Sequence, residues 1–586
     1  MDISQIKSPA DIKGRSMEEL AQICADMRKA LIAKLSSVGG HVGPNLGFLE
    51  ATVALHYVFD APADKIVFDV SHQSYVHKML TGRMEAFVDP EKYNDVTGYT
   101  NPRESEYDLF SIGHTSTSVS LATGLAKARD LQGLSHNVVA VIGDGSLSGG
   151  EAFEGLDFGA VAGTNFIVVV NDNQMSIAPN EGALYNNLAL LRETKGTAQS
   201  NYFRTLGYDY LYVDDGNDLE SLIAAFRKVR DCEGHVVVHV NTEKGMGLPV
   251  AQEHKEAFHY HAPFDPYTGA SKSTDAELDY TDIFIRYMLS KIKADKSVVA
   301  LTAGVPGAVG FTPDVRMEAG QQFVDVGIAE EQAVAMASGL AKAGCRPVVV
   351  EPATFIQRAY DQLAQDVSIN RQPVTVVTFY GGVWGMTDET HLGFFDVPMI
   401  ANIPGILFLM PTCAGEYIAM LDWAVGQTVT PVVIRTPSGA VVNRSGDFSV
   451  DYNTVGYEIV REGHDVAIIA AGDFLQLGLD AADRLVWMGI NPTVINPRYV
   501  SGLDTSLLDK LRGYRCVITL EDNAIDGGIG QKIAAYLGDA PVKVHVLGLP
   551  KRFVNRYDPD ELLKSSGLTP EAIAGIALAS SGVDAV

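Results

Sequence analysis

The residues best suited to chemistry in this sequence follow two apolar runs in the first third of the chain. Gly143-Asp144-Gly145 closes the run at 138–143, and Asn171-Asp172-Asn173 closes the run at 166–171. Parallel strands deliver their carboxyl ends to one edge of a sheet, so Asp144 and Asn173 should lie side by side. Their oxygens, with a backbone carbonyl from the next loop, would suit Mg²⁺ bridging a diphosphate. By itself Gly143-Asp144-Gly145 could also be an ordinary turn; the paired spacing favours the metal site.

The elements that must position these residues alternate between strand and helix. Short β-branched runs are typical of strands buried on both faces of a parallel sheet. Such runs occur at 65–70, 138–143, 166–171 and 235–241, with helix-like stretches at 118–131 and 150–163. This alternation predicts βαβ units and an α/β fold with mostly parallel sheets.

The chain of 586 residues is too long for one hydrophobic core. A segment rich in Pro, Gly, Ser and Asp at 262–280 predicts a linker, and a turn-rich stretch at 436–456 predicts a second. We therefore expect three α/β domains, at 1–262, 280–440 and 455–586. The polar segment 185–202 is either a mobile lid or an ordinary surface helix.

Composition excludes several classes of protein. With 45 Lys and Arg against 72 Asp and Glu, the net charge is −27, which argues against a nucleic-acid or anionic-membrane partner. The five cysteines are scattered without a CxxC pair, so a disulfide framework or zinc site is not expected. The N-terminus has no signal-like pattern and no apolar run is long enough to span a membrane. We expect a cytoplasmic enzyme that acts on small molecules.

Long ordered motifs identify a family resemblance. The segments at 36–60, 68–83, 104–120, 143–156 and 170–184 resemble 1-deoxy-D-xylulose-5-phosphate synthases of the thiamine-diphosphate-dependent transketolase superfamily, as do VDVGIAEEQAV (324–334), ATFIQRAYDQ (353–362) and THLGFFD (390–396). The resemblance implies a transketolase-like fold, thiamine diphosphate and Mg²⁺ as cofactors, and a homodimer with the cofactor between the first two domains. It also implies a diphosphate-binding first domain, a pyrimidine-binding second domain and a transketolase C-terminal-like third domain.

The resemblance also assigns roles to individual residues. Those near the cofactor diphosphate would be His72, His114, Gly143, Asp144, Gly145, Ser146, Asn173 and Lys244. The metal ligands would be Asp144, Asn173 and the carbonyl of Met175. Glu330 would touch N1′ of the aminopyrimidine, Phe355 would stack on that ring, and His41 and His391 would face the reacting carbons as catalytic groups. The substrates would also meet Arg358, Tyr380, Asp388 and Ser438.

Glu330 has a role that chemistry explains directly. A carboxylic acid hydrogen-bonded to N1′ favours the imino form of the aminopyrimidine, whose N4′ can then accept the proton of the thiazolium carbon. Because that carboxyl must hold a proton in a poorly hydrated cleft, burial should raise its pKa. Without the family pattern, Glu330 could simply begin a helix, and His41 and His391 could be structural. Phe355 would then be a core residue and Lys244 a surface charge.

Departures from the family pattern cluster on the side of the aldehyde acceptor. Tyr380 and Ser438 replace the two arginines with which the family binds the phosphate of glyceraldehyde 3-phosphate. A Tyr or Ser hydroxyl does not replace a guanidinium charge. Pro352, Thr387 and Gln332 replace a tyrosine, an aspartate and a histidine of the pattern, although Asp388 is adjacent to Thr387. Arg444, Arg358 or a loop lysine could supply the missing charge.

Three hypotheses remain open at this point. The first is the family reaction, in which pyruvate is decarboxylated and its two-carbon unit joined to glyceraldehyde 3-phosphate. In the family, the product feeds isoprenoid, thiamine and pyridoxal biosynthesis. The second is a related carboligase or transketolase-like enzyme with a different or unphosphorylated acceptor. The third is a cofactor-binding pseudoenzyme, which the presence of Glu330, Asp144, Asn173 and His41 argues against.

Overall fold

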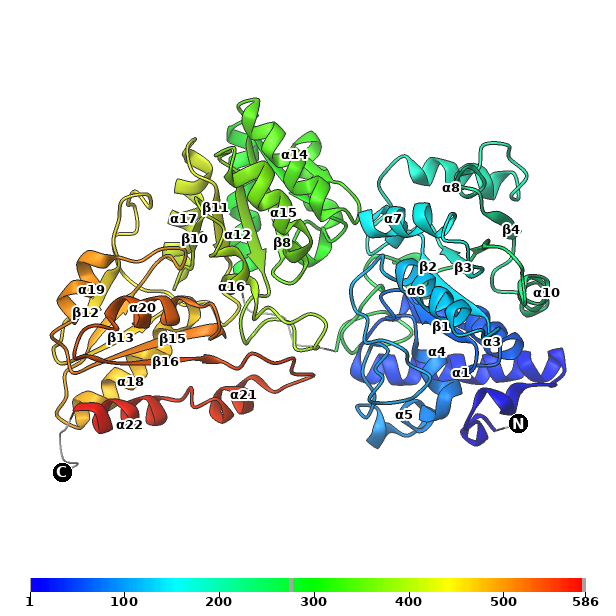
Figure 1. The fold of residues 1–586 in the computed structure, drawn as a ribbon, viewed down its shortest axis with the longest axis horizontal. Coiled ribbons are helices and arrows are strands. Elements are labelled where there is room, and N and C mark those ends of the chain that lie inside the picture. Colours follow the sequence, from blue (N-terminus) through cyan, green and yellow to red (C-terminus); the bar gives the residue numbers. More distant parts are fainter. Residues whose placement is uncertain (1, 273–277, 582–586) are drawn as a thin grey trace. The chain divides into compact units, whose positions relative to one another are not determined.

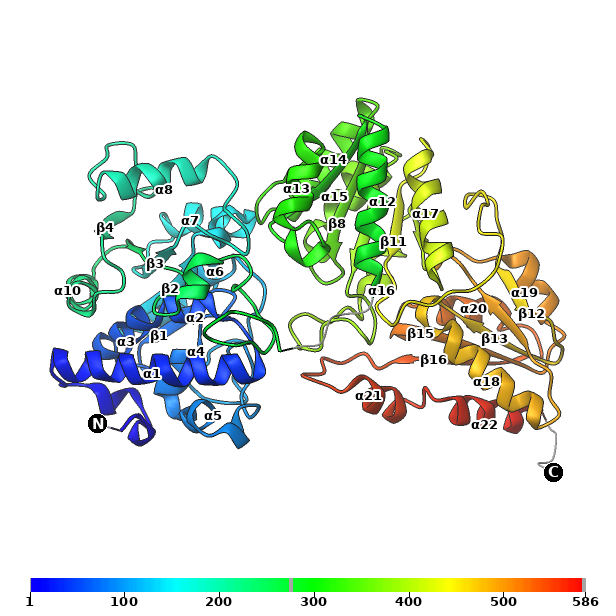
Figure 2. The same ribbon diagram turned by 180° about the vertical axis from the view of Figure 1, so that it is seen from behind.

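The structure is a computed structural model that describes residues 2–272 and 278–581. It contains two compact units (Figures 1 and 2). Unit 1 comprises Met1–Ala276 with Gly327–Ala329, and unit 2 comprises Glu277–Val326 with Glu330–Val586. Part of the linker expected at 262–280 lies outside the described residues.

Unit 1 is built on one five-stranded, wholly parallel sheet in the order β1-β2-β3-β5-β4. Its strands are β1 (Lys65–Phe68), β2 (Val138–Gly143), β3 (Ile167–Asp172), β4 (Asp209–Val213) and β5 (Val236–Asn241). Its helices are α1 (Met17–Val38), α2 (Gly43–Gly47), α3 (Leu49–Val58), α4 (Tyr75–Lys78), α5 (Glu85–Val88), α6 (Ser118–Leu131), α7 (Gly150–Gly159), α8 (Leu184–Glu193), α9 (Tyr202–Leu206), α10 (Leu219–Val229) and α11 (Pro249–Glu253). The α/β class with parallel strands is therefore confirmed.

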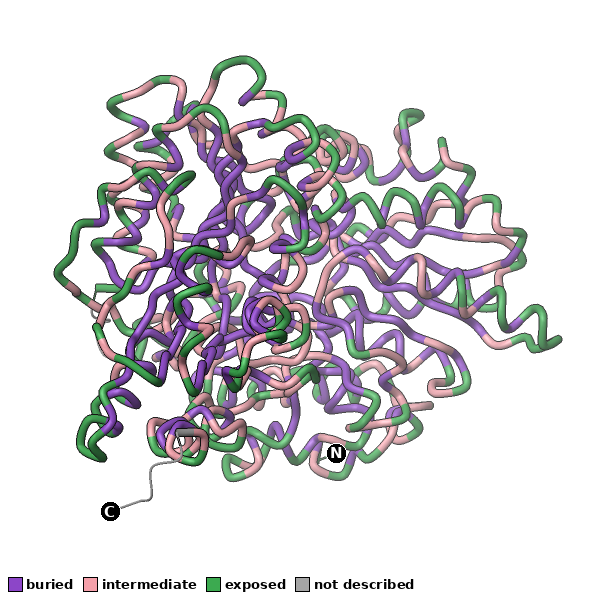
Figure 3. The backbone as a smooth tube through the Cα atoms, turned by 60° about the vertical axis from the view of Figure 1, so that its left-hand side comes forward, coloured by how far each residue is buried: buried purple, intermediate pink, exposed green. Residues whose placement is uncertain are grey.

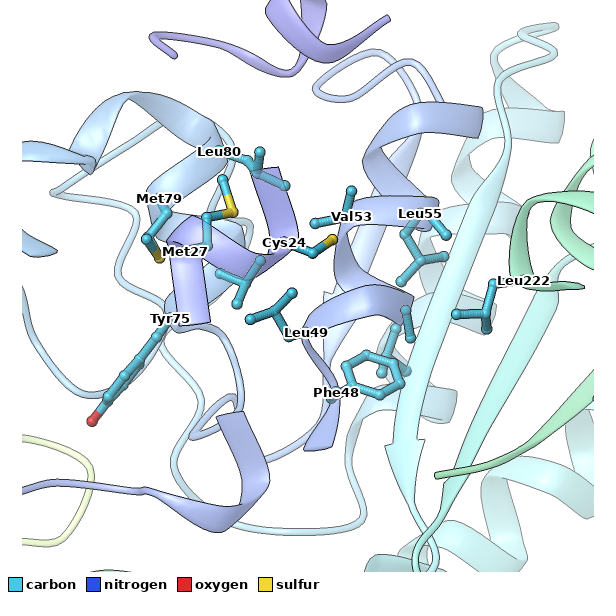
Figure 4. Close-up of a cluster of buried hydrophobic side chains, with 14 of the residues drawn as sticks. Cys24, Met27, Phe48, Leu49, Val53, Leu55, Tyr75, Met79, Leu80 and Leu222 are labelled. Atoms are coloured by element: carbon cyan, nitrogen blue, oxygen red, sulfur yellow. The ribbon is translucent and has the colours of Figure 1, made fainter. Parts of the chain in front are cut away.

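Both faces of this sheet are covered, which explains the continuous apolar composition of its strands. Val139 and Val141 of β2 face a core formed with α1, α3 and α10, whereas Val138 and Ala140 face a second core formed with α6 and α7. Figure 3 shows the buried residues toward the interior, and nearly every residue of β2, β3 and β5 is buried. Figure 4 shows part of the first core, where apolar side chains of α1, α3 and α10 meet.

Local signals in the sequence fix the first long helix. Ser16 caps α1 by accepting a hydrogen bond from the backbone N–H of Glu19, whose carboxylate accepts one from Ser16 N–H. This reciprocal pair satisfies two N–H groups that the helix itself leaves without partners. The helix ends before Gly39, at a φ of 79° that a residue with a Cβ rarely adopts.

Unit 2 contains two sheets. The first is six-stranded and parallel, in the order β10-β11-β9-β8-β6-β7. Its strands are β6 (Val298–Thr302), β7 (Phe323–Asp325), β8 (Arg346–Pro352), β9 (Thr375–Phe379), β10 (Leu407–Leu409) and β11 (Val432–Arg435). The second has the order β12-β14-β13-β15-β16, and its edge strand β12 is antiparallel to β14. Its strands are β12 (Glu458–Arg461), β13 (Val466–Ala470), β14 (Thr493–Asn496), β15 (Cys516–Ala524) and β16 (Lys543–Leu549).

The two sheets of unit 2 share one hydrophobic core. Leu301, Val349 and Val376 of the first sheet belong to the same buried cluster as Ile469 and Val517 of the second. The helices of unit 2 are α12 (Tyr280–Ala294), α13 (Pro313–Ala319), α14 (Glu330–Lys342), α15 (Tyr360–Gln362), α16 (Asp396–Ile400), α17 (Ala414–Gly426), α18 (Leu475–Trp487), α19 (Thr505–Leu511), α20 (Ile529–Leu537), α21 (Pro559–Ser565) and α22 (Pro570–Ser581). The shared core explains why the two sheets form one compact unit, although the sequence predicts a domain for each.

Two expectations from composition can be compared with the structure. All five cysteines are free thiols. Over the residues that the structure describes, no helix combines the length and apolar character needed to cross a membrane. The segment 185–202 begins in α8, which buries Leu188 and Leu191 against the sheet; whether it moves as a lid stays a prediction.

The core in Figure 4 gives a first testable prediction. Leu49 is fully buried there, so Leu49→Ala should lower the free energy of unfolding by about 2–5 kcal/mol through lost burial and the cavity left behind. Leu131→Ala is the control, because Leu131 is 80% exposed, and we expect a change below about 0.5 kcal/mol. Denaturant unfolding of both variants measures the difference; equal effects would contradict the packing described.

Candidate active-site residues in the two units

The ends of β2 and β3 bring the predicted metal ligands together. Gly143 is in register with Asn171, and the backbone N–H of Asp144 donates to the carbonyl of Asn171 over 2.9 Å. Asp144 and Asn173 each follow directly on these adjacent strand ends and are both buried. The parallel register thus delivers a carboxylate and an amide to one edge of the sheet.

The Asp144 carboxylate lies in a crowded acidic environment. Asn180 donates a hydrogen bond to its Oδ2 over 2.7 Å. Burial, and then the nearby charge of Asp172, raise the pKa of Asp144 well above its usual range. Asp172 is itself bound by Arg192 and by His239, at 2.5 Å and 2.8 Å. A cation beside Asp144 would offset the cost of ionising it.

The remaining oxygen ligands predicted for the metal lie in the loop after β3. Met175 N–H donates to Asn173 Oδ1 over 3.2 Å, so the loop folds back on the amide side chain. No group of three or more His, Cys, Asp or Glu side chains in the described chain is arranged to hold a metal ion. A metal at this edge would therefore use the amide and carbonyl oxygens of the predicted set.

The glycines beside Asp144 have different steric environments. A Cβ on Gly145 would lie 2.6 Å from the Cβ of Ser176, so a larger residue would displace the following loop. A Cβ on Gly143 would meet no atom within 4 Å. Ser146, next in the chain, is buried and its carbonyl accepts a hydrogen bond from Ser116 Oγ over 2.8 Å. Backbone at Gly143 is thus open to a ligand while Gly145 is tightly packed.

Histidine rings form a cluster in unit 1. His41 lies 5.0 Å from His72 and 5.8 Å from His259, measured between ring centroids, and His72 stacks on His259 at 5.1 Å. The rings of Tyr99 and Tyr260 also flank His41. The structure therefore brings His41, assigned to the reacting carbons, next to His72, assigned to the diphosphate, and adds His259.

Lys244 joins this cluster from the loop after β5. Its Nζ donates to the carbonyl of Ser176 over 2.6 Å and lies 3.1 Å from His259 Nδ1. Burial lowers the pKa of Lys244 to about 7, and burial followed by the charge of Lys244 lowers the pKa of His259 well below its usual range. The Ser176 carbonyl links Lys244 to the loop that contains Met175.

His114 lies on a loop that is fixed by a buried aspartate. Asp69 accepts hydrogen bonds from the backbone N–H groups of Ser116 and Ser118, at 2.7 Å and 2.9 Å. These bonds hold the turn between His114 and the start of α6. The turn that follows the partly buried His114 is thereby fixed beside the end of β1.

In unit 2, Glu330 begins α14 and is 4% exposed. Its Oε2 is buried, has no hydrogen-bond partner among the described residues, and lies 4.0 Å from an Nη atom of Arg358. Burial raises the pKa of Glu330 to about 7, although the charge of Arg358 opposes that rise. Glu330 is thus a buried carboxyl that can hold a proton near neutral pH.

A second buried carboxyl lies at the end of β8. Glu351 is fully buried, and its Oε1 accepts hydrogen bonds from Ala303 N–H and Thr302 Oγ1, at 2.5 Å and 3.2 Å. Burial, and then the charge of Glu330, raise the pKa of Glu351 well above its usual range. Glu351, Asn180 and His259 were not among the residues predicted from sequence. For Glu351 the sequence does contain a signal, because it is an acid in an otherwise apolar strand.

Phe355 and His391 lie together in unit 2. Their ring centroids are 5.6 Å apart. His391 Nδ1 lies 2.8 Å from Thr390 Oγ1, and burial lowers the pKa of His391 to about 4, so the imidazole is neutral at pH 7. Asp388 accepts hydrogen bonds from the N–H and hydroxyl of Thr390, at 3.0 Å and 2.7 Å. Asp388 therefore shapes the loop that carries His391.

Tyr380 and Ser438 bond to backbone carbonyls. Tyr380 donates to Ala308 and Ser438 donates to Gly381, each over 2.6 Å. Tyr380 has a φ of 58°, a left-handed conformation uncommon for a bulky residue. Both hydroxyls already have hydrogen-bond acceptors within the protein.

The arginines considered as substitutes are also engaged with carboxylates. Arg444 bonds both carboxylate oxygens of Glu458, at 2.8 Å and 2.9 Å. Arg358 lies beside Glu330. Arg444 therefore balances a carboxylate of the edge strand β12.

Comparison with known proteins places this chain among relatives of similar length. The family model described as 1-deoxy-D-xylulose-5-phosphate synthase matches residues 3–201. The pyrimidine-binding and C-terminal domain models of transketolase match residues 276–442 and 456–573. A transketolase variant from Pichia stipitis, solved by crystallography, is 16% identical over 97% of this chain and 98% of its own, with a TM-score of 0.46.

Two curated relatives are named 1-deoxy-D-xylulose-5-phosphate synthase. That of Desulforudis audaxviator is 38% identical over 604 residues, covering 96% of this chain and 95% of the relative. Synthase 1 of Geobacter sulfurreducens is 38% identical over 614 residues, covering 98% of this chain and 96% of the relative. The resemblance identified from the sequence motifs is confirmed: this chain belongs to the 1-deoxy-D-xylulose-5-phosphate synthase family.

Proposed function

We propose that this chain decarboxylates pyruvate and joins the remaining two-carbon unit to glyceraldehyde 3-phosphate, giving 1-deoxy-D-xylulose 5-phosphate. Its membership of the synthase family over nearly the whole chain carries this proposal. The buried carboxyl of Glu330 supports it, because the family's chemistry needs an acid that holds a proton near neutral pH. The alternative hypothesis, a related carboligase with another aldehyde acceptor, is not favoured, because the relatives are named 1-deoxy-D-xylulose-5-phosphate synthases.

The cofactor of this family is thiamine diphosphate, and the residues of unit 1 suit its diphosphate. Asp144 is a buried carboxylate whose ionisation a cation would favour, and the backbone at Gly143 is open. We assign Mg²⁺ to Asp144, Asn173 and the Met175 carbonyl. We assign the diphosphate to His72, His114 and Lys244 with the backbone from Gly143 to Ser146. A phosphate beside Lys244 would also compensate the burial of its ammonium group.

The residues of unit 2 suit the aminopyrimidine. The Glu330 Oε2 is a buried polar atom without a hydrogen-bond partner among the described residues, and a ring nitrogen would satisfy it. Phe355, partly exposed beside His391, offers an aromatic face for stacking. We therefore assign Glu330 and Phe355 to this ring.

Bound thiamine diphosphate supplies the electron sink that lets a 2-oxoacid lose carbon dioxide. Glu330 holds a proton at its carboxyl and donates it in a hydrogen bond to the pyrimidine. His41 and neutral His391 are assigned to proton transfer and hydrogen bonding at the reacting oxygens of the substrates. Arg358, Tyr380, Asp388 and Ser438 are assigned to substrate binding. The low exposure of Glu330 and His391 limits the access of water.

We further propose that the enzyme is a homodimer in the cytoplasm and that its product serves isoprenoid and thiamine biosynthesis. These statements rest on family resemblance. Purified protein with thiamine diphosphate and Mg²⁺ tests the reaction when supplied with pyruvate and either glyceraldehyde 3-phosphate or glyceraldehyde. Selective formation of 1-deoxy-D-xylulose 5-phosphate is expected; equal or better use of the unphosphorylated aldehyde would contradict the proposed acceptor.

Glu330→Gln tests the assigned proton donor. Because the amide cannot transfer a proton, pyruvate-dependent carbon dioxide release should fall about 10²–10⁴-fold. The matched control is Glu331→Gln, which removes a partly exposed acid from the next position on α14 and should retain activity within about threefold. Full turnover by Glu330→Gln would overturn the assignment.

Asp144→Asn tests the metal assignment. Loss of the buried carboxylate charge should raise the Mg²⁺ concentration for half-maximal activity at least about tenfold, since charged ligands dominate binding of hard cations. Asp157→Asn is the control, because Asp157 is exposed on α7. Titration of metal-free enzyme with Mg²⁺ gives both values. An unchanged Mg²⁺ requirement in Asp144→Asn would exclude this ligand.

The raised pKa of Glu330 predicts a specific dependence of stability on pH. In the unfolded state this carboxyl ionises near pH 4.5, but in the folded state only near pH 7. Its ionisation therefore disfavours folding increasingly between these values, by roughly 3 kcal/mol once the pH exceeds 7. Cofactor-free Glu330→Gln should be stabilised relative to wild type at pH 8 and not at pH 4. Denaturant unfolding at several pH values measures the free energy of unfolding of both proteins. The same pH dependence of this free energy in both would contradict the assigned burial.

A further inference from the structure

The loop that carries His391 is closed at its base by glycines. This His391 loop, residues 380–395, connects β9 to α16. Gly382 N–H donates to the carbonyl of Gly393 over 2.9 Å, and a Cβ on Gly393 would overlap the carbonyl oxygen of Tyr380. The two ends of the loop therefore lie side by side, and His391 is only two residues from this base.

Arg435, the last residue of β11, binds the base of the His391 loop. Its Nη2 donates to the carbonyl of Gly393 over 2.8 Å. The same nitrogen donates to Asp396 Oδ1 over 3.1 Å, and the Nε lies 2.9 Å from Asp396 Oδ2. One guanidinium, in a side chain that is 4% exposed, thus holds both the loop backbone and the first residue of α16.

A residue of the second sheet of unit 2 orients this guanidinium. Arg435 Nη1 donates to Oδ1 of Asp522 over 2.5 Å, and Asp522 is buried in β15. Ala524 N–H, at the end of the same strand, donates to the carbonyl of Phe394 over 2.9 Å. Figures 1 and 2 show α16 beside β15. The strand β15 therefore contacts the His391 loop both directly and through Arg435.

The loop has no side chain where it meets this ion pair. A Cβ on Gly381 would overlap the Nε of Arg435, and a Cβ on Gly382 would overlap the carboxylate of Asp522. Gly382 also has a φ of 74°, in the region that favours glycine. Two consecutive glycines thus let the loop backbone approach the buried charges closely.

A third acid extends the cluster to the segment after β11. Asp473 accepts a hydrogen bond from Ser438 N–H over 2.9 Å, and the Ser438 hydroxyl donates to the carbonyl of Gly381 over 2.6 Å. Burial raises the pKa of Asp473 to about 7 and that of Asp396 to about 6. Protons held by these acids near neutral pH reduce the negative charge that the single guanidinium must balance.

We propose that Arg435, oriented by Asp522, is a positioning residue that fixes the base of the His391 loop and thereby the place of the His391 imidazole. The inference rests on the proposed function for the role of His391 at the reacting oxygens. A displacement of about 1 Å in a catalytic group can cost about a hundredfold in rate, so the anchoring of this loop matters. The second sheet of unit 2 then contributes to the reaction without touching a substrate.

Asp522→Asn in the full-length enzyme with its cofactors tests this from the side of the second sheet. The amide keeps the shape of the side chain but removes the charge that orients Arg435, so kcat should fall about tenfold or more. The matched control is Glu521→Gln, the neighbouring buried acid of β15, which binds the N–H groups of Ile529 and Gly530 instead. It should keep kcat within about twofold.

Gly381→Ala tests the same contact from the loop side without changing any charge. Its Cβ would push the loop away from Arg435, and kcat should again fall about tenfold. Gly426→Ala is the control, because a Cβ there would meet no atom within 4 Å.

A double-mutant cycle with His391→Ala separates positioning from a purely structural role. In that background, Asp522→Asn and Gly381→Ala should change the residual kcat less than about twofold, because effects that act through one residue are not additive. The same tenfold loss in the His391→Ala background would overturn the inference.

Trp384 provides a readout that does not depend on turnover. It belongs to the His391 loop, and its ring centroid lies 5.9 Å from that of Phe474. After Trp423→Phe and Trp487→Phe, it is the one tryptophan left of three. Quenching of its fluorescence by acrylamide should rise at least about twofold in both test variants and stay unchanged in both controls.

This fluorescence result also separates the inference from the proposed reaction. Raised quenching in the two test variants alone supports the anchoring of the loop even if the wild type forms no 1-deoxy-D-xylulose 5-phosphate. In that case only the proposed function fails. Unchanged quenching in both test variants, or equal changes in the controls, would overturn the inference while leaving the proposed reaction intact.

Discussion

The burial of the Glu330 carboxyl is the constraint on which the chemistry proposed for unit 2 depends. In water, solvation stabilises the ionised form of a carboxyl group, and burial removes that solvation. In the folded protein, one oxygen of Glu330 has no hydrogen-bond partner among the described residues, and Arg358 lies 4.0 Å away. The result is an acid that changes its protonation near neutral pH. Burial, and then the charge of Glu330, also raise the pKa of Glu351, because two buried acids near each other cannot both ionise cheaply.

Much of this arrangement could be predicted from sequence. Continuous β-branched runs marked β2, β3 and β5 because both faces of the parallel sheet are covered. The residues that follow β2 and β3 could be placed together because parallel strands share an edge. Short or peripheral strands such as β4, β7 and β12 were missed, since they carry polar or aromatic residues and have no sustained apolar run. The expected helix at 150–163 ends at Gly159 in the structure.

The candidate site was less predictable where it depends on tertiary contacts. His259 lies in a segment without apolar periodicity and reaches His72 only through the fold. Asn180 meets Asp144 across a loop, and the bond of Arg435 to Asp522 joins residues far apart in the chain. No local pattern encodes such pairs. The departures at Tyr380 and Ser438 were visible in sequence, but the hydrogen bonds of their hydroxyls to the carbonyls of Ala308 and Gly381 were not.

The common core of the two sheets in unit 2 has a consequence for how this protein can vary. Since Val349 and Val517 belong to one buried cluster, the C-terminal region is no independent appendage that could be exchanged as a module. Because this interior is close-packed, a change in volume in β15 or α20 would strain the packing of β8, the strand that contacts α14. Residues in the last third of the chain are therefore constrained by packing against the first sheet of unit 2 as well as within the second.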